Sequence, residues 1–336
     1  MREAMAWAEV GDEQEREDPT VLALEQRVAA LLGHEDAVYL PTATMGNEIA
    51  LVILGERGTE LVVEATAHIM VSELGGAAAF SGLQTRGLPG FRGRLTPEQI
   101  RATTHADGSF HTPRTSIVAL ENTHNTAGGT IWPIHELRAV VETARELEIH
   151  VHLDGARLLN ASVAQQVAPA ELAGMFDTVT LCLSKGLGCP LGALIAGSAE
   201  LMHRARREKH RFGGAMRQAG IIAAAGLYAL DHNVARLSED HTNAKILARG
   251  LAEIPGVAIN VAHVESNLVF FDVAGTGLTA KDVVDRLAAR GVRMGASGRT
   301  RIRAVTHLDV SQADVERAVA VAQEVLGKAR AGALGE

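Results

Sequence analysis

Short apolar runs alternate along the chain with longer segments in which apolar residues recur at helical spacing. The runs, rich in β-branched residues, cover 36–40, 60–63, 116–120, 150–153, 178–183 and 193–196, and helical patterns lie between them, as at 133–147 and 200–209. Continuous apolar runs of this length indicate strands buried on both faces, and their alternation with helices indicates a mainly parallel sheet. We therefore predict an α/β fold that binds its ligand at the carboxyl ends of the strands.

The order of the predicted helices and strands changes after residue 236. The pattern there predicts a helix over 237–254, strands near 257–261 and 267–273, a helix over 280–290, strands near 292–294 and 301–305, and a last helix from Gln312. This order indicates a smaller α+β domain. The predicted organisation is an N-terminal arm over 1–29, a large domain over 30–236 and a small C-terminal domain over 237–336.

Charge and composition narrow the function classes. The chain has 336 residues, of which 47% are hydrophobic, with a net charge of -8 and a pI near 6.0, so it offers no basic surface for nucleic acid or an anionic membrane. No apolar run reaches the length of a membrane span. Two cysteines suit a reducing compartment, and fourteen scattered histidines give no metal-site spacing. We expect a soluble, cytoplasmic protein with a small-molecule substrate and no metal.

The arm contains a charged stretch, residues 12–18. Charge runs are usually solvated, so we expect a solvated surface, with an arm that reaches a partner subunit as the alternative.

Lys185 follows a predicted strand, within Ser184-Lys185-Gly186. A lysine forms a Schiff base only when its amine is neutral, and desolvation beside a buried strand favours that form. A lone lysine is more often a surface residue. Asp154, at the end of the run 150–153, strengthens the interpretation, because a carboxylate beside a ring nitrogen keeps a pyridinium protonated. A helix N-cap is an equally open role for Asp154.

Residues for a flat ring, a carboxylate and a phosphate follow other predicted strands. Ala156 is small enough for a ring to lie against the backbone, and Arg157 offers a fork for a carboxylate, with a surface ion pair as its alternative. Ala43 and Thr44 lie where a strand passes into a helix, and backbone N–H groups there suit an anion. A simple capped helix is the alternative.

A second glycine-rich turn, residues 213–218, contains Arg217, which could hold a phosphate or a loop of a neighbouring subunit. An ordinary helix start is the alternative. His68 and His124 also follow predicted strands. An imidazole there can stack on a ring or exchange a hydroxyl proton near neutral pH, and a structural hydrogen bond is the alternative for each.

Five motifs together resemble one enzyme family. They are Glu-Asn-Thr-His-Asn at 121–125, Asp-Gly-Ala-Arg at 154–157, Cys-Leu-Ser-Lys-Gly-Leu-Gly at 182–188, Met-Arg-Gln-Ala-Gly at 216–220 and Arg-Ala-Val-Thr-His-Leu-Asp at 303–309. In this order they closely resemble the low-specificity L-threonine aldolases, and the likeness covers nearly the whole chain. The resemblance implies the aspartate-aminotransferase-like fold type I, with a mostly parallel seven-stranded sheet and pyridoxal 5'-phosphate (PLP) as cofactor.

The resemblance also implies roles for single residues. Lys185 would carry the cofactor, Asp154 would pair with its ring nitrogen, His68 and Ala156 would face its ring, and Ala43, Thr44 and Arg217 would hold its phosphate. Arg157 and Arg303 would grip the substrate carboxylate, and His124, with His68, would contact the β-hydroxyl. The implied reaction is retro-aldol cleavage of L-threonine or L-allo-threonine to glycine and acetaldehyde, in a homotetramer.

The sequence departs from the family pattern near the expected site. A tyrosine of the pattern is Glu15 here, a glycine is Ala43, a lysine is His210, and a third glycine is Ala215. Two alternatives therefore stay open. One is another PLP reaction on the same scaffold, such as phenylserine cleavage, β-elimination or racemisation, and the other is a non-catalytic homologue.

Overall fold

Two compact units make up the chain. The large unit combines residues 1–127 with 131–235, and the small unit combines residues 128–130 with the chain from 236 onward. The computed structural model describes residues 1–105, 107 and 109–333. Each unit encloses an apolar core of its own. Helix α2 (Pro19–Leu32) continues across residue 30, where the sequence placed the start of the large domain.

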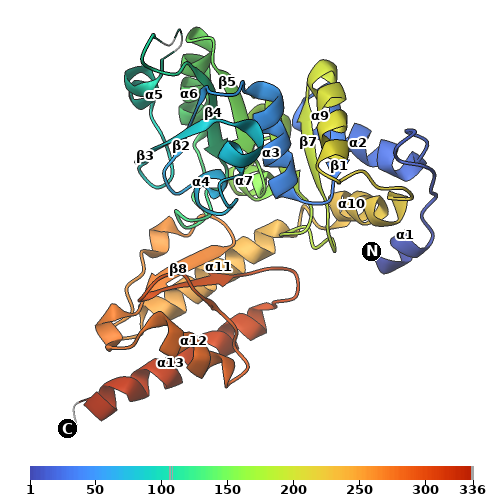
Figure 1. The fold of residues 1–336 in the computed structure, drawn as a ribbon. Helices are drawn as coiled ribbons and strands as arrows, with labels where there is room; N and C mark the ends of the chain where they lie inside the picture. Colours follow the sequence, from blue (N-terminus) through green and yellow to red (C-terminus); the bar gives the residue numbers. More distant parts are fainter. Residues whose placement is uncertain (106, 108, 334–336) are drawn as a thin grey trace. The chain divides into compact units, whose positions relative to one another are not determined.

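A seven-stranded sheet forms the centre of the large unit (Figure 1). The strand order is β1-β7-β6-β5-β4-β2-β3, and β7 runs antiparallel to both of its neighbours while the other neighbouring pairs are parallel. This confirms the predicted fold class. The strands are β1 Asp36–Leu40, β2 Glu60–Glu64, β3 Gln84–Leu88, β4 Thr115–Glu121, β5 His150–Asp154, β6 Thr178–Cys182 and β7 Ala193–Gly197.

Helices cover the sheet because its strands are apolar on both faces: β2, β4, β6 and β7 are buried at every position. Helix α3 packs on β5, β6 and β7, helices α9 and α2 on β1 and β7, and helix α6 on β5. The helices of this unit are α1 Arg2–Ala6, α2, α3 Ala43–Leu54, α4 His68–Val71, the π-helix η1 Ala77–Ser81, α5 Pro97–Thr103, α6 Ile134–Glu146, α7 Leu158–Gln165, α8 Pro169–Ala173, α9 Ala199–Arg211 and α10 Gly220–His232.

The small unit has a three-stranded antiparallel sheet, β8-β10-β9, with helices packed against it. Its elements are α11 Leu237–Ala252, η2 Val261–His263, β8 Leu268–Asp272, η3 Ala274–Thr276, α12 Ala280–Ala288, β9 Gly295–Ala296, β10 Arg301–Val305 and α13 Gln312–Ala333. Two strand predictions are wrong here. Residues 257–261 form only an isolated bridge, from Ala258 to Asp272, and the strand expected at 292–294 is instead the two-residue β9.

None of the helices in the described residues is both long enough and apolar enough to cross a membrane.

Candidate active site

Five parallel strands direct their carboxyl ends to one edge of the large sheet, and each leads into a segment with candidate chemistry. The turn with Ala43 and Thr44 follows β1, His68 follows β2, His124 follows β4, Asp154 ends β5, and Lys185 follows β6. In the sheet register Asp154 lies between Glu121 of β4 and Thr180 of β6. The topology therefore brings these predicted residues to a common edge.

Asp154 is buried, with 3% of its surface exposed. Its Oδ1 accepts a hydrogen bond from the backbone N–H of Ala156 at 3.0 Å, and its Oδ2 accepts one from Nδ2 of Asn47 at 3.0 Å. Both donors are neutral. Hydrogen bonds of this kind favour the ionised carboxylate, and a buried carboxylate is stabilised further by a cation.

Asn47 links Asp154 to a chain of buried polar groups. Its Nδ2 also donates to Oε1 of Glu73 at 2.9 Å, and its Oδ1 lies 3.1 Å from Nε2 of His152. The other ring nitrogen of His152 lies 2.9 Å from Oγ1 of Thr178. Burial lowers the pKa of His152 to about 4, so the ring is neutral and donates through Nε2 to Asn47. This chain fixes the orientation of the Asn47 amide toward the two carboxylates.

His68 begins helix α4 and lies beside Glu73, with Nδ1 2.8 Å from Oε1 of that carboxylate. The backbone N–H of His68 donates to Oε2 of Glu121 at 2.7 Å, which fixes the start of the helix. The hydrogen bond that Glu73 accepts from His68 raises the pKa of His68, while burial and the charge of Lys185 act in the opposite direction. Lys185 is thus close enough for its charge to act on His68.

Lys185 lies in the loop between β6 and the antiparallel β7, and its side chain is half-buried. The loop is held at both ends: the N–H of Leu183 donates to the carbonyl of Gly192 at 2.9 Å, and the N–H of Gly192 donates to the carbonyl of Pro41 at 3.0 Å. The loop of Lys185 is therefore tied directly to the end of β1. The first turn of α3 begins just after that point.

The first turn of α3 provides an anion site of the expected kind. Thr42 is the N-cap, and its hydroxyl accepts from the N–H of Met45 at 3.2 Å. Helix geometry leaves the N–H groups of Ala43 and Thr44 without intrahelical acceptors, and the helix dipole adds positive potential. Thr44 is exposed beside these N–H groups.

His124 is fully buried, and both of its ring nitrogens have partners. Nε2 lies 3.0 Å from Oε2 of Glu64, and Nδ1 accepts from the N–H of Ala127 at 3.3 Å. Although burial opposes ionisation, hydrogen bonds from His124 and Thr66 lower the pKa of Glu64 to about 2. In this arrangement neither nitrogen of His124 offers a lone pair to a substrate, and its contact with the β-hydroxyl stays a prediction.

The segment after β5 places two further candidates. Ala156 and Arg157 are half-buried, and Arg157 precedes helix α7 as its N-cap residue. Gly155 has a structural reason to be small: a Cβ there would lie 2.9 Å from the backbone oxygen of Thr180 on β6. The absence of a side chain at 155 is therefore required by the sheet itself.

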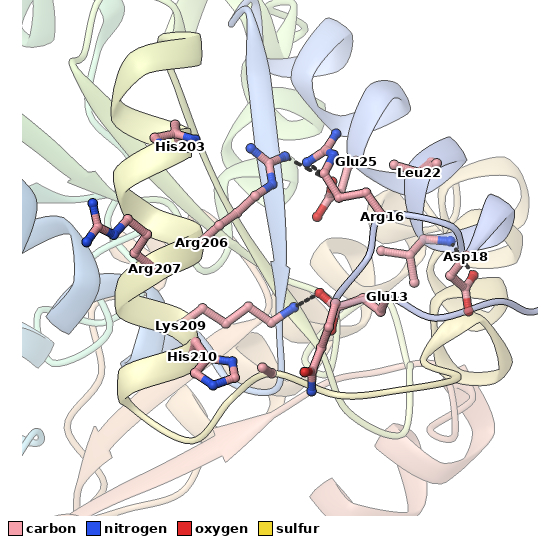
Figure 2. Close-up of a pocket in the computed structure, with 13 residues that line it drawn as sticks. Glu13, Arg16, Asp18, Leu22, Glu25, His203, Arg206, Arg207, Lys209 and His210 are labelled. Carbon is pink, nitrogen blue, oxygen red and sulfur yellow. Dashed lines mark hydrogen bonds and ion pairs between the residues drawn. The ribbon is translucent and has the colours of Figure 1, made fainter.

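The charged stretch 12–18 packs against the second glycine-rich turn, so the expectation of a solvated surface is wrong at its two ends (Figure 2). Glu13 pairs with Nζ of Lys209 on α9 and accepts from the N–H of Met216 at 2.9 Å. Asp18 is fully buried as the N-cap of α2 and accepts from the N–H of Gly220 at 2.8 Å. Only residues 14–17 of the stretch are exposed.

Arg217 is held by this same segment. Its NH1 lies 2.7 Å from Oδ2 of Asp12, and 61% of its side chain is exposed. Glu13, Lys209, His210 and Ala215 line a cavity of about 350 Å³ beside the turn (Figure 2). The pairing with Asp12 gives Arg217 a partner within its own chain, and its role toward a phosphate stays a prediction.

Arg303 belongs to the small unit, where it lies on β10 opposite Phe270 of β8. Burial lowers the pKa of its guanidinium, and within the described part of the chain its Nε is buried without a hydrogen-bond partner. A half-buried guanidinium with an unsatisfied donor suits a carboxylate ligand.

One group at the edge also has the composition of a metal site. His68, Glu73 and Asp154 offer ligand atoms within 4.8 Å of one another. Hydrogen bonds account for this grouping, since Glu73 accepts from His68 and from Asn47, and Asp154 accepts from Asn47 and Ala156. We therefore interpret the group as a hydrogen-bond network.

The sheet topology is that of the α/β PLP fold type I, and the family match and the relatives define the class of protein as a PLP-dependent enzyme. The sequence model of the beta-eliminating lyase family matches residues 1–274, and the chain belongs to that family. This confirms the resemblance drawn from the five motifs.

Relatives and a solved structure agree with this assignment. The chain is 41% identical to the low specificity L-threonine aldolase of Escherichia coli, over 93% of this chain and 91% of that protein. It is 37% identical to low-specificity L-threonine aldolase 1 of Arabidopsis thaliana, over 97% and 92%. The structure of Leishmania major threonine aldolase superposes with a TM-score of 0.82 at 21% identity, covering 96% of this chain and 95% of that one, and so supports the fold.

Three residues of the network were not predicted from the sequence: Asn47, Glu73 and His152. Asn47 lies one helical turn after Ala43, and His152 lies two residues before Asp154, on the same face of β5. The helical and strand periods could have placed these two beside the site. No such period links Glu73 to Asn47, which is 26 residues away.

Proposed function

We propose that this protein is a PLP-dependent lyase that cleaves L-threonine, L-allo-threonine and related β-hydroxy-α-amino acids to glycine and an aldehyde. The observation that carries the proposal is the buried carboxylate of Asp154, bonded only to neutral donors in the described residues, at the edge that also bears Lys185. A protonated ring nitrogen supplies the cation that such a carboxylate lacks.

The remaining residues fit the same cofactor. The N–H groups of Ala43 and Thr44 suit its phosphate, Lys185 supplies an amine for its aldehyde carbon, and His68 lies beside Lys185 and Asp154, where it can face the ring. When bound, PLP supplies an electron sink for the pair released as the Cα–Cβ bond breaks. Arg157 and Arg303 are the proposed ligands of the substrate carboxylate.

His68 is the best-placed group to accept the proton of the substrate hydroxyl. Its Nδ1–H donates to Glu73, so the lone pair of the neutral ring is on Nε2, and 28% of the side chain is exposed. Glu73 thereby fixes both the tautomer and the ring orientation, as a positioning residue does for a general base. His124 is buried and bonded to Glu64 and Ala127, and it supports the same edge of the sheet from the interior.

Relatives named low-specificity L-threonine aldolases favour aldol cleavage over the other reactions of this scaffold, since two of them exceed a third identity over more than nine-tenths of the chain. No feature described above favours β-elimination, racemisation or a non-catalytic role. The retained Lys185 and Asp154 speak against the last.

Replacing the lysine tests the cofactor assignment. Wild-type protein purified with PLP should absorb visible light, and Lys185→Ala should lose the band that depends on the covalent link. Lys209→Ala is the control, because Lys209 is paired with Glu13 and should leave the band in place. A band that survives in Lys185→Ala would reject the assignment.

Substrate comparison tests the reaction. Aldehyde release should be measured with L-threonine, L-allo-threonine, phenylserine and D-threonine under the same conditions. We expect acetaldehyde from both L-threonine isomers and none from the D-isomer. If no L-isomer yields an aldehyde, the aldolase proposal fails, and if phenylserine alone does, the substrate class is the bulkier one.

Assembly and location follow from the same proposal. We propose a cytoplasmic homotetramer, supported by the exposed apolar side chains of Trp7 and Ile221 in the large unit and by two free, buried cysteines. Light scattering coupled to gel filtration would measure the mass of the assembly, and a monomer at micromolar concentration would contradict it.

A further inference from the structure

Two glutamates beside His68 carry oxygens that the hydrogen bonds described so far leave unsatisfied. Glu48, on helix α3, is 3% exposed, and Glu73 is 5% exposed. Within the described residues, both carboxyl oxygens of Glu48 and Oε2 of Glu73 are buried without a hydrogen-bond donor. Buried carboxylate oxygens without donors are costly, so this arrangement calls for an explanation.

The carboxyl group of Glu48 lies against Gly76, whose N–H donates to the backbone carbonyl of Glu73 at 2.9 Å, and Glu48 is close enough for the charge of Glu73 to act on it. The backbone shapes this contact, because a Cβ at position 76 would overlap the Glu48 carboxyl group, and glycine occupies that position. Two ionised carboxylates held close together in a buried site would repel strongly. A single proton between them removes the repulsion and supplies the missing donor.

We propose that Glu48 and Glu73 share one proton, and that the neutral Glu48 acts as a positioning residue by donating to Oε2 of Glu73. Glu73 is then saturated: its Oε1 accepts from Nδ1 of His68 and from Nδ2 of Asn47, and its Oε2 accepts from Glu48. The acid holds Glu73 between the imidazole of His68 and the amide that supports Asp154.

The charges around the pair are consistent with this assignment. Burial raises the pKa of Glu48, and the charge of Glu73 raises it further, to about 8. In the described residues, hydrogen bonds link the pair to His68 through Glu73, and to Asp154 and His152 of β5 through Asn47. The charge of Lys185 also acts on His68. Loss of the Glu48 proton places a second negative charge next to the partner of His68, so proton affinity at His68 should respond to it.

The role of Glu48 rests on the proposed function only in so far as His68 handles substrate, and its test needs no turnover. The cofactor-free protein, labelled with ¹³C and ¹⁵N at histidine, is titrated by NMR, with the His68 signals assigned from His68→Asn. Wild type should show a second inflection of the His68 signals near pH 8, where Glu48 ionises. Glu48→Gln keeps a donor to Glu73 but cannot ionise, so that inflection should disappear.

A second variant and a control separate this role from general packing. Glu48→Leu removes the donor, which leaves Glu73 a stronger acceptor, so the pKa of His68 should be higher than in Glu48→Gln. Glu25→Gln replaces another buried glutamate whose pKa is raised by burial, on α2 beside Arg206, and should leave the His68 titration unchanged. An inflection near pH 8 that persists in Glu48→Gln overturns the proposal.

The wild-type protein gives an independent measurement if the variants fold poorly. With ¹³C-labelled glutamate, one carboxyl signal should stay in the protonated range at pH 6.5 and move only near pH 8. If every glutamate carboxyl is ionised at pH 6.5, no shared proton exists. Because these readouts use protein without cofactor, a failure of aldehyde release would leave them unaffected.

Discussion

At the scale of single residues, Glu73 determines the chemistry available to His68. It fixes the imidazole through Nδ1, and it draws Asn47 toward Asp154, so one carboxylate orients both a candidate proton acceptor and the group expected to face a ring nitrogen. Because the hydrogen bond to Glu73 raises the pKa of His68, the fraction of neutral His68 increases only as the pH rises through that higher value.

Glu73→Gln should move the pH dependence of aldehyde release. The neutral amide no longer stabilises the imidazolium, so the pKa of His68 falls and the ascending limb of kcat/KM shifts to lower pH. We expect the maximal rate to drop at least tenfold. A positioned general base accelerates a reaction by at least that factor, and the amide holds the imidazole of His68 less well than the carboxylate does. A pH profile of wild type and variant measures both effects.

An unchanged ascending limb in Glu73→Gln would exclude His68 as the group that titrates. Glu60→Gln is the matched control, because Glu60 is equally buried on β2 and pairs with Arg86.

The sequence predicted residues of this site where chemistry and position coincide. Lys185 and His68 each follow a strand and Asp154 ends one, and the carboxyl ends of the parallel strands lie at one edge of the sheet whatever the details of packing. Glu48 gave no such signal, because a charged residue inside a predicted helix ordinarily faces solvent. Its burial depends on a glycine at position 76, in a loop whose path the sequence does not reveal.

At the scale of elements, the close approach of β5 and β6 sets the edge that carries Asp154 and Lys185. Gly155→Ala would place a Cβ 2.9 Å from the backbone oxygen of Thr180. Since backbone cannot give way as a flexible side chain does, we expect a loss of about 1 to 3 kcal/mol in the free energy of unfolding. Urea unfolding measures it.

Gly327→Ala is the control for that substitution. Gly327 lies in helix α13 with open space around the position of a Cβ, so alanine should be neutral or stabilise by about 0.5 to 1 kcal/mol. Equal effects at both glycines would show that the contact with β6 is unimportant.

Buried apolar strands were predictable, including the edge strand β1, whereas the polar edge strand β3 and the short β9 were not. The six buried runs match β1, β2, β4, β5, β6 and β7 to within one residue at each end, because burial on both faces forces a continuous apolar sequence. Strand β3, Gln84–Leu88, was not predicted, since as an edge strand it is largely polar and mostly half-buried or exposed. In the small unit, β9 has only two residues, both exposed, and no pattern of that length is readable.

At the scale of the whole molecule, each unit carries a buried histidine with low proton affinity. Burial lowers the pKa of His152 in the large unit and of His241 in the small unit to about 4. Below about pH 6.5 the unfolded chain takes up protons that the folded chain does not, so stability is lost as the pH falls from 6.5 toward 4.

The expected loss between pH 7 and pH 5 is about 1 to 2 kcal/mol for each histidine, by the linkage of proton binding to folding. Urea unfolding at the two pH values should show it, and His152→Gln and His241→Gln should each remove part of the dependence. His203→Gln, at an exposed position on α9, serves as the reference. Equal stability of wild type at pH 7 and pH 5 would contradict this prediction.

The contact between Gly192 and Pro41 has a consequence for how the protein can change over evolution. It joins the loop of Lys185 to the end of β1, so the span from the amine to the first turn of α3 is set by backbone hydrogen bonds within a single sheet. A ligand that is bound both at the Lys185 amine and at the first turn of α3 tolerates little change in the distance between them. Insertions are ordinarily accepted in surface loops, yet one added residue between Pro41 and Thr44, or between Leu183 and Gly192, would change the distance between the amine and this turn.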